Sequence, residues 1–294
     1  MSRPPFHLVG VLPFALGALL AWREPAPFHW DVCTWGVAGV VLVMLTTYYA
    51  GEYWDAAEDS LSGGASRFAG GSQVVQRGFL PLRAPLWGSV ASLALAVAVG
   101  LVLQFGYRTG PWTLPLGIVG ILGGFLYSTR PVRWVSSGLG ELWIGFCYGW
   151  LPVAVGYYLQ RARIQTLIHW LAIPIACTIV NVILLNEFPD YAADSATGKR
   201  NLTVRIGRER AARVYGGVAV VSWMATLATL GRGVPAIALL PYLPVLAVAL
   251  WTTGAVLRGR WRDGAALERL CAATLLVNLG TTATFILAFG ATRP

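Results

Sequence analysis

Apolar stretches of roughly twenty residues alternate with short polar segments along the chain, and about twenty apolar residues are what an α-helix needs to cross a bilayer. Only seven residues precede the first stretch and no small-residue cleavage site follows it, so we interpret it as a retained helix. The pattern predicts an all-α, polytopic membrane protein with about nine transmembrane helices, and residues 1–294 form a single transmembrane domain. The predicted spans cover residues 8–22, 33–51, 83–105, 112–128, 138–158, 167–187, 209–231, 235–257 and 267–290.

The composition agrees with a membrane protein. Hydrophobic residues make up 56% of the chain and charged residues only 12%, with a mean hydropathy of +0.62, whereas about a quarter of the residues in soluble domains are charged. The four cysteines are scattered singly, and the three histidines show no ligand-like spacing. This favours small buried cysteines over a disulfide framework or a zinc site.

The net charge of +9 follows the alternation of the loops. With nine spans, one set of alternate loops and the helix ends beside them hold 16 of the 22 Lys and Arg residues. The positive-inside rule places this set in the cytoplasm. We therefore expect no nucleic-acid partner, but a multi-pass protein in the lipid bilayer of a bacterial or archaeal cell membrane. The loops of this set are residues 1–7, 52–82, 129–137, 188–208 and 258–266.

Two of these loops carry copies of one acidic motif. Residues 51–63 and 186–198 share six of thirteen positions, and together they hold seven of the 13 carboxylates in the chain. Each copy follows an apolar span and contains two aspartates four positions apart, which places the pair on one face of a helix. The pairs are Asp55 with Asp59 and Asp190 with Asp194.

Carboxylates gathered at a membrane surface are costly unless something cationic neutralises them. Pairing with the abundant loop arginines is one explanation. We favour a divalent-cation site, because Mg²⁺ takes oxygen ligands and usually keeps a ligand phosphate in its shell. Glu58 and Glu187 fall off the i, i+4 stripe and are expected to be solvated or indirect. The predicted metal ligands are Asp55, Asp59, Asp190, Asp194 and Glu52.

Basic and aromatic residues flank the two motifs. Carboxylates, metal ions and basic side chains together would form a diphosphate cradle that stabilises charge on a departing diphosphate. Its basic candidates are Arg67, Arg130, Arg133 and Lys199. An allylic cation left behind would need a dry, aromatic-lined cavity, although an aromatic belt at the membrane interface explains such residues equally well. The candidate substrate contacts are Tyr53, Trp54, Tyr127 and Asn186.

These residues resemble motifs of the UbiA superfamily of intramembrane prenyltransferases. Residues 186–207, which begin Asn186-Glu-Phe-Pro-Asp190, look like the second aspartate motif of that superfamily. The segment Tyr127-Ser-Thr-Arg130-Pro-Val-Arg133 looks like its basic connection between the fourth and fifth helices. The runs Gly138-Leu-Gly-Glu141 and Gly156-Tyr-Tyr-Leu-Gln160 look closest to the 1,4-dihydroxy-2-naphthoate polyprenyltransferases of menaquinone biosynthesis.

The resemblance implies nine helices around a central cavity that binds Mg²⁺ and an isoprenyl diphosphate donor. The diphosphate would ionise, and an electron-rich ring carbon of an aromatic or other lipid-pathway acceptor would attack the cation. One departure is Gly51, where the superfamily usually has Asn, and it leaves the acceptor open. The implied catalytic residues are Asp55, Asp59, Asp190, Asp194 and Lys199, with Arg67 and Arg130 on the diphosphate.

Two other functions use the same features differently. A membrane terpene cyclase would ionise the same diphosphate and let the chain attack itself. A secondary transporter would explain the repeated motif as two halves of the fold, but its site should lie near the membrane midplane and not at helix ends. Donor chain length and acceptor identity stay open, as does the oligomeric state, because lipid-facing and partner-facing helix surfaces look alike.

Overall fold

The structure, a computed structural model, describes residues 4–61 and 72–292, and its regular elements over these residues are helices. Nine long helical segments occupy this part of the chain, and each coincides with one predicted span to within four residues at either end. The segments are α1 (Pro4–Trp22), α2 (Trp30–Trp54), α4 with η1 (Arg83–Leu101 and Val102–Gly106), α5 (Thr113–Ser128), α6 with η3 and α7 (Gly140–Gly145, Phe146–Trp150 and Leu151–Arg161), α8 (Thr166–Asn186), α11 (Arg208–Leu230), η4 with α12 (Ala236–Ala238 and Leu239–Leu257) and α13 (Gly264–Ala291).

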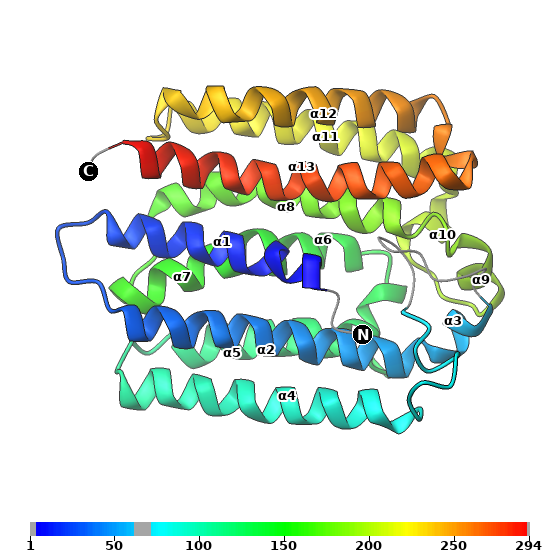
Figure 1. Ribbon diagram of the computed structural model, residues 1–294, viewed down its shortest axis with the longest axis horizontal. Coiled ribbons are helices and arrows are strands. Elements are labelled where there is room, and N and C mark those ends of the chain that lie inside the picture. Colours follow the sequence, from blue (N-terminus) through cyan, green and yellow to red (C-terminus); the bar gives the residue numbers. More distant parts are fainter. Residues whose placement is uncertain (1–3, 62–71, 293–294) are drawn as a thin grey trace.

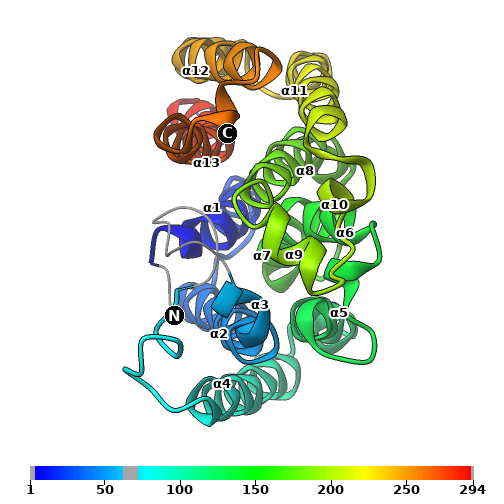
Figure 2. The ribbon, with the colours of Figure 1, turned by 90° about the vertical axis from the view of Figure 1, so that its right-hand side faces the viewer.

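Length and composition support the predicted membrane spans. Among the described residues, seven of the nine segments are long and apolar enough to cross a bilayer, and α1 and α5 are shorter apolar helices. The segments run alongside one another in a single bundle (Figure 1). Seen along the bundle, α11, α12 and α13 lie on one side and α4 on the other, with α1, α2, α5, α7 and α8 between them (Figure 2).

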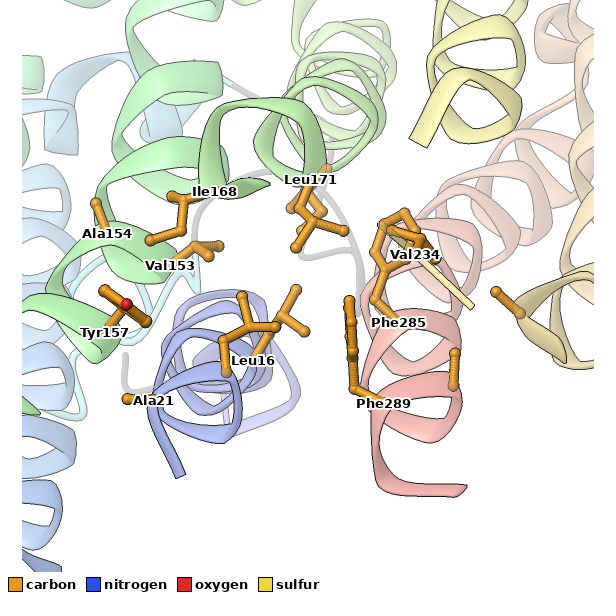
Figure 3. Close-up of a cluster of buried hydrophobic side chains, with 14 residues drawn as sticks. Leu16, Ala21, Val153, Ala154, Tyr157, Ile168, Leu171, Val234, Phe285 and Phe289 are labelled. Atoms are coloured by element: carbon orange, nitrogen blue, oxygen red, sulfur yellow. The ribbon is translucent and has the colours of Figure 1, made fainter. Parts of the chain in front are cut away.

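A buried cluster joins the two sides of the bundle. Leu16 of α1, Val153 of α7, Leu171 of α8 and Phe285 of α13 meet there, and each is completely buried (Figure 3). Burial of apolar side chains of this size stabilises a contact by roughly 1.5–3 kcal/mol each in water, but between membrane helices close packing carries more of the association. The cluster therefore fixes α8 and α13 against α1 and α7.

Three short helices gather at one end of the bundle, to the right in Figure 1. They are α3 (Ala56–Leu61), α9 (Tyr191–Ala196) and α10 (Leu202–Ile206). Asn201 caps α10, because its side chain accepts a hydrogen bond from the Val204 N–H at 2.8 Å. Gly207 follows with φ +80°, a conformation that glycine adopts without strain, and α11 then begins. This end of the bundle carries both acidic motifs.

Candidate active site

The first acidic motif straddles a break between two helices. Helix α2 ends at Trp54, Asp55 follows, and α3 begins at Ala56. Helical hydrogen bonding continues across the break, since the Asp55 N–H donates to the Gly51 carbonyl at 2.9 Å and the Asp59 N–H to the Asp55 carbonyl at 2.8 Å. The two aspartates are therefore one helical turn apart, as their spacing predicts.

The second motif is built in the same way. Helix α8 ends at Asn186, and Pro189, which cannot donate a backbone hydrogen bond, lies in the turn before α9. Asp190 immediately precedes α9, and the Asp194 N–H donates to the Asp190 carbonyl at 2.8 Å. The sequence repeat thus corresponds to a structural repeat: a long helix, a break at the first aspartate, and a short helix that carries the second.

The two motifs converge on one cavity. Helices α3 and α9 contact each other (Figure 2), and a cavity of about 250 Å³ lies between the ends of α2 and α8. We call it the site cavity. Eight of the thirteen predicted site residues line it, and they are Glu52, Asp55, Asp59, Tyr127, Asn186, Asp190, Asp194 and Lys199.

Four of the other five predicted site residues do not line the site cavity. Tyr53 and Trp54 do not line the site cavity, and their rings pack edge to face at 5.3 Å. Arg130 is exposed, and with Arg133 it borders a separate surface cavity beside Gly198. Arg67 lies outside the described residues. The substrate contact predicted for Tyr53 and Trp54 therefore stays a prediction.

The charges of the two motifs act on each other across the site cavity. Burial, followed by the charges of Asp55, Glu52 and Asp190, raises the pKa of Asp59 to about 7. Burial also raises the pKa of Asp194 to about 6, although Lys199 opposes the shift. The carboxylates of each motif thus raise the pKa of an aspartate in the other motif. The repulsion between them is concentrated where α3 and α9 meet.

Lys199 lies at the centre of this charge. Its ammonium nitrogen is 3.4 Å from Asp194 Oδ1. Burial alone would lower the pKa of Lys199, but the charges of Asp55, Asp194 and Asp190 hold it above its ordinary value. Lys199 therefore stays protonated and offers three N–H donors to an anion in the site cavity.

Asp55 is also paired with an arginine. Arg133 Nη2 lies 3.3 Å from Asp55 Oδ1 and also bonds Glu58, while the Ser128 hydroxyl donates to Asp55 Oδ2 at 2.9 Å. Pairing with a loop arginine, the alternative raised from the sequence, thus applies to Asp55 and Glu58. Arg133 neutralises this edge of the first motif from outside the site cavity.

Three polar residues that sequence reasoning missed hold the predicted carboxylates in place. Ser128 binds Asp55, Ser72 donates its N–H and its hydroxyl to the two oxygens of Glu52, and Asn201 donates to Asp194 Oδ2 at 2.8 Å. Ser128 and Asn201 both lie inside motifs that the sequence singles out. Their residue types are common at helix ends, so only the structure distinguishes them from ordinary caps.

Two buried glutamates, Glu141 and Glu187, bind the backbone beside the second motif. Glu141 Oε1 accepts the Leu202 N–H at 2.8 Å, and Glu187 Oε2 accepts the Thr203 N–H at 3.3 Å. Burial, and then the charge of the neighbouring Glu141, raise the pKa of Glu187 well above its ordinary value. The pair anchors the start of α10, which carries Asn201 to Asp194. Glu187 also lines the site cavity and is buried, so of its two expected positions, solvated or indirect, the solvated one does not apply.

Comparison with known proteins identifies the family. The sequence profile of the UbiA prenyltransferase family matches residues 11–289. The chain belongs to the UbiA prenyltransferase family. It is 26% identical over 226 residues to the 1,4-dihydroxy-2-naphthoate octaprenyltransferase of Mycobacterium tuberculosis, covering 76% of this chain and 75% of that protein. It is 25% identical to the Bacillus subtilis enzyme of the same name, covering 80% and 74%.

The UbiA fold is also shared with solved structures. A UbiA homologue from Archaeoglobus fulgidus, solved with GPP and Mg²⁺, superimposes with a TM-score of 0.65 at 19% identity and covers 97% of this chain and 98% of that one. The resemblance read from the sequence is therefore confirmed in family and fold. The protein is a multi-pass helical membrane enzyme of the prenyltransferase class, which transfers alkyl groups other than methyl.

The donor set fits a divalent cation of the kind held by that homologue. Over the described part of the chain, no three His, Cys, Asp or Glu side chains come close enough to enclose an ion by themselves. Mg²⁺ does not need such a cage, because it typically takes one or two carboxylates and completes its shell with water and substrate phosphate. The two facing aspartate pairs match this requirement, and one member of each pair, Asp59 and Asp194, has a raised pKa.

Position 51, where this UbiA chain departs from the usual Asn, is not constrained by packing. Gly51 lines the site cavity, and a β-carbon placed on it would lie 3.7 Å from Ser128 Oγ, an ordinary contact distance. Its backbone is helical and has no positive φ. The glycine therefore leaves space in the site cavity that a larger side chain would fill.

Proposed function

We propose that this protein is a Mg²⁺-dependent intramembrane prenyltransferase that transfers an isoprenyl chain from its diphosphate to an aromatic acceptor in menaquinone-type quinone biosynthesis. The observation that carries the proposal is the meeting of both aspartate pairs at one cavity, with Lys199 between them. Such a centre binds a polyphosphate through metal ions and fixed cationic donors. The site cavity faces the apolar bundle on its other side, where an isoprenyl chain would lie.

Asp55, Asp59, Asp190 and Asp194 would hold the ions, with Glu52 fixed beside them by Ser72. Bound Mg²⁺ supplies positive charge that stabilises the departing diphosphate. Lys199 would donate hydrogen bonds to diphosphate oxygens that become more negative as the donor ionises. Asp194 and Asn201 orient this lysine loop, so the donors are in place before charge develops.

In the reaction, the bond between the first carbon of the chain and the diphosphate oxygen breaks, and the electron pair leaves with the diphosphate. Tyr48, Tyr127 and Tyr148 line the site cavity and would stabilise the allylic cation through their ring faces. A ring carbon of the acceptor then forms the new carbon–carbon bond. That carbon loses its proton, or its carboxyl group as CO₂, which restores the aromatic ring.

The naphthoate acceptor is supported by the relatives, two of which are named for 1,4-dihydroxy-2-naphthoate. The three tyrosines and the mostly apolar walls suit a flat phenolic ring better than a glycerol phosphate, which would need further cationic groups. The acceptor would enter beside Gly51, where the absence of a side chain leaves room for a ring near Ser128.

The decisive experiment measures diphosphate release and prenylated product by purified protein in nanodiscs, with Mg²⁺, geranylgeranyl diphosphate and 1,4-dihydroxy-2-naphthoate. We expect Asp55→Asn and Asp190→Asn to lower the rate by at least about 100-fold, because each removes a negative ligand for the Mg²⁺ ions that stabilise the departing diphosphate. The matched control is Asp31→Asn, which makes the same change at the exposed opposite end of α2. Chelation of Mg²⁺ should abolish both signals.

Each competing function predicts a different result. A cyclic hydrocarbon formed without any acceptor would replace the transferase proposal with a terpene cyclase. Absence of diphosphate release under all conditions, with uptake of solute into proteoliposomes, would favour a transporter. Equal rates for Asp31→Asn and Asp190→Asn would show that the acidic motifs are not the reaction centre.

A further inference from the structure

A second cavity lies deeper in the bundle, directly behind the site cavity. It measures about 130 Å³, its walls are almost entirely apolar, and α1, α2, α4, α5 and the α6–α7 segment enclose it. We call it the inner chamber. Unusually many of its wall positions are glycines, among them Gly39 of α2 and Gly120 of α5. The space therefore exists because side chains are missing from facing helices.

The inner chamber adjoins the proposed reaction centre. Thr47, Ile144 and Tyr148 line both cavities and stand between them, and we call these three residues the neck. The Thr47 hydroxyl already donates to the Val43 carbonyl at 3.0 Å, so this residue does not require a polar partner in the neck. An apolar chain attached to a diphosphate in the site cavity can therefore pass this neck without separating polar groups from their partners.

Packed apolar side chains form a floor at the far end of the inner chamber. Val99, Leu103 and Leu159 line the inner chamber and belong to a buried apolar cluster with Phe14 and Val32. Leu103 and Leu159 expose only 4% and 5% of their surface. A chain that enters from the neck must therefore stop, bend or displace packed side chains at this depth, because protein interiors have few voids.

The depth of the inner chamber can be read along α2. Its lining runs from Thr47 at the neck to Gly36 beside the floor, and eleven residues of α-helix rise about 16 Å. Each isoprene unit adds four chain bonds of about 1.5 Å, so it extends a chain by roughly 5 Å. About three units fit beyond the unit that reacts in the site cavity.

We propose that the inner chamber measures the isoprenoid tail of the donor: its floor sets the length limit, and Gly39 and Gly120, which have no side chains, keep the depth above the floor open. This inference rests on the proposed function and extends it to the donor: chains of up to about four isoprene units lie straight in the inner chamber, whereas much longer ones do not. It departs from the octaprenyl donors named for the relatives.

The two glycines lie at different depths in the inner chamber, so the proposal predicts a different length limit for a substitution at each. A β-carbon on Gly120 would point between Leu151 and Val43, at 3.4 and 3.9 Å from them, and one on Gly39 would lie 3.4 Å from Val99. These are ordinary contacts, so a side chain can be added at either position. Val43 lies one helical turn below Thr47 and Gly39 lies two turns below it, so leucine at position 120 fills the inner chamber nearer the neck than leucine at position 39.

The experiment compares kcat/KM for donors of one, two, three, four and eight isoprene units. We expect the wild type to use four units well and eight units at least about tenfold less efficiently. Gly39→Leu should lower the four-unit value at least about tenfold and spare three units, while Gly120→Leu should also lower the three-unit value and spare two. Leu103→Ala, which deepens the floor, should raise the use of donors longer than four units.

Gly217→Leu is the control, since it makes the same change on α11. Gly217 lines neither cavity, and no atom lies within 4 Å of the added β-carbon. Thermal unfolding of each variant shows whether it folds, and Leu103→Ala tests the proposal in the opposite direction if a leucine variant does not. If the wild type and all variants turned over every donor with the same dependence of kcat/KM on chain length, the length limit would be overturned and the proposed function would stand. Wild-type use of eight units as efficient as four would do the same. Failure with every donor would overturn the proposed function as well.

Discussion

At the scale of single residues, the active site depends on groups that never touch the reaction. Glu141 is 1% exposed, and its carboxylate accepts the N–H of Leu202 at the start of α10. That segment carries Lys199 and Asn201, which bind the two oxygens of Asp194. Glu141 therefore positions the second motif through the backbone, and its conspicuous place in the run Gly138–Glu141 has a structural explanation.

We expect Glu141→Leu to lower both the melting temperature and the transfer rate. Leucine leaves the Leu202 N–H without an acceptor, which costs about 1–3 kcal/mol for a buried group, and a displacement of the Lys199 loop by about 1 Å can reduce the rate up to about 100-fold. Glu141→Gln keeps an acceptor oxygen and should retain most of the stability. Melting curves and initial rates decide, and wild-type behaviour of Glu141→Leu would contradict this role.

The sequence reveals the aspartates because a carboxylate is rare in an apolar chain and costly near a membrane. It does not reveal Ser128, Asn201 or Glu141, because hydroxyl, amide and single acidic residues occur at many helix ends for local reasons. The sequence also does not show which aromatic residues reach the site cavity: Tyr127 lines it, whereas Tyr53 and Trp54 do not. Tyr53 and Trp54 immediately precede Asp55, but one residue of helix turns a side chain by about 100°, so neighbours in sequence need not share the site cavity.

At the scale of elements, a close helix crossing explains a second conspicuous run. Gly17 of α1 and Gly156 of α7 face each other's backbones, since a β-carbon on either would lie about 2 Å from a carbonyl oxygen of the partner helix. Gln160 then exchanges two hydrogen bonds of 2.9 Å with the backbone of His29. The run Gly156–Gln160 therefore holds α7 against α1 and ties down the connection to α2, far from the reaction centre.

Glu24, in the same connection, makes this contact sensitive to acid. Partial burial raises the pKa of Glu24, but hydrogen bonds from Tyr157 and Arg163 and the charges of Arg163 and Arg161 outweigh burial and lower it below its ordinary value of 4.5. A carboxyl whose pKa is lower in the folded state than in the unfolded state stabilises the fold at pH values above its pKa in the unfolded state. That contribution is lost as the pH falls through the folded value.

We therefore expect Glu24→Gln to melt a few degrees below the wild type at neutral pH. The difference should shrink below about pH 4.5 and vanish once the wild-type carboxyl is protonated. Melting curves of both proteins between about pH 3 and pH 7 measure it, and comparing the two removes the effect of other carboxylates. A difference that stays constant over this range would show that the glutamate acts by shape alone.

The long helices were predictable because apolar length decides them, and the ends of the predicted spans lie within four residues of the observed ones. The short elements were not. Helices α3 and α9 have six residues each, too few to be stable alone, and tertiary contacts between them select their conformation. The π-helical stretch Phe146–Trp150 likewise has no sequence signal, although it presents Tyr148 to both cavities.

At the scale of the whole molecule, the two ends of the bundle differ in charge and in task. The end with α3, α9 and α10 carries the acidic motifs and most of the basic loops, whereas the opposite end has five Arg residues among those described (Figure 1). Among these five, Arg161 and Arg163 bind Glu24, and Arg232 lies 4.0 Å from the centre of the Trp170 ring. The charge asymmetry that the sequence contains is thus kept by the fold.

The positive-inside rule predicts that the reaction end faces the cytoplasm, where soluble diphosphate donors and Mg²⁺ are available. We expect a membrane-impermeant maleimide to label Thr166→Cys in intact cells and to label Gly264→Cys only after the membrane is opened. Both positions are exposed and lie at opposite ends of the bundle. The unsubstituted chain is the blank, because its four cysteines are buried or partly buried. The reverse labelling order would place the acidic motifs outside the cell and separate the enzyme from a cytoplasmic donor. The charge distribution argues against this orientation, because about three quarters of the basic residues would then have to cross the bilayer.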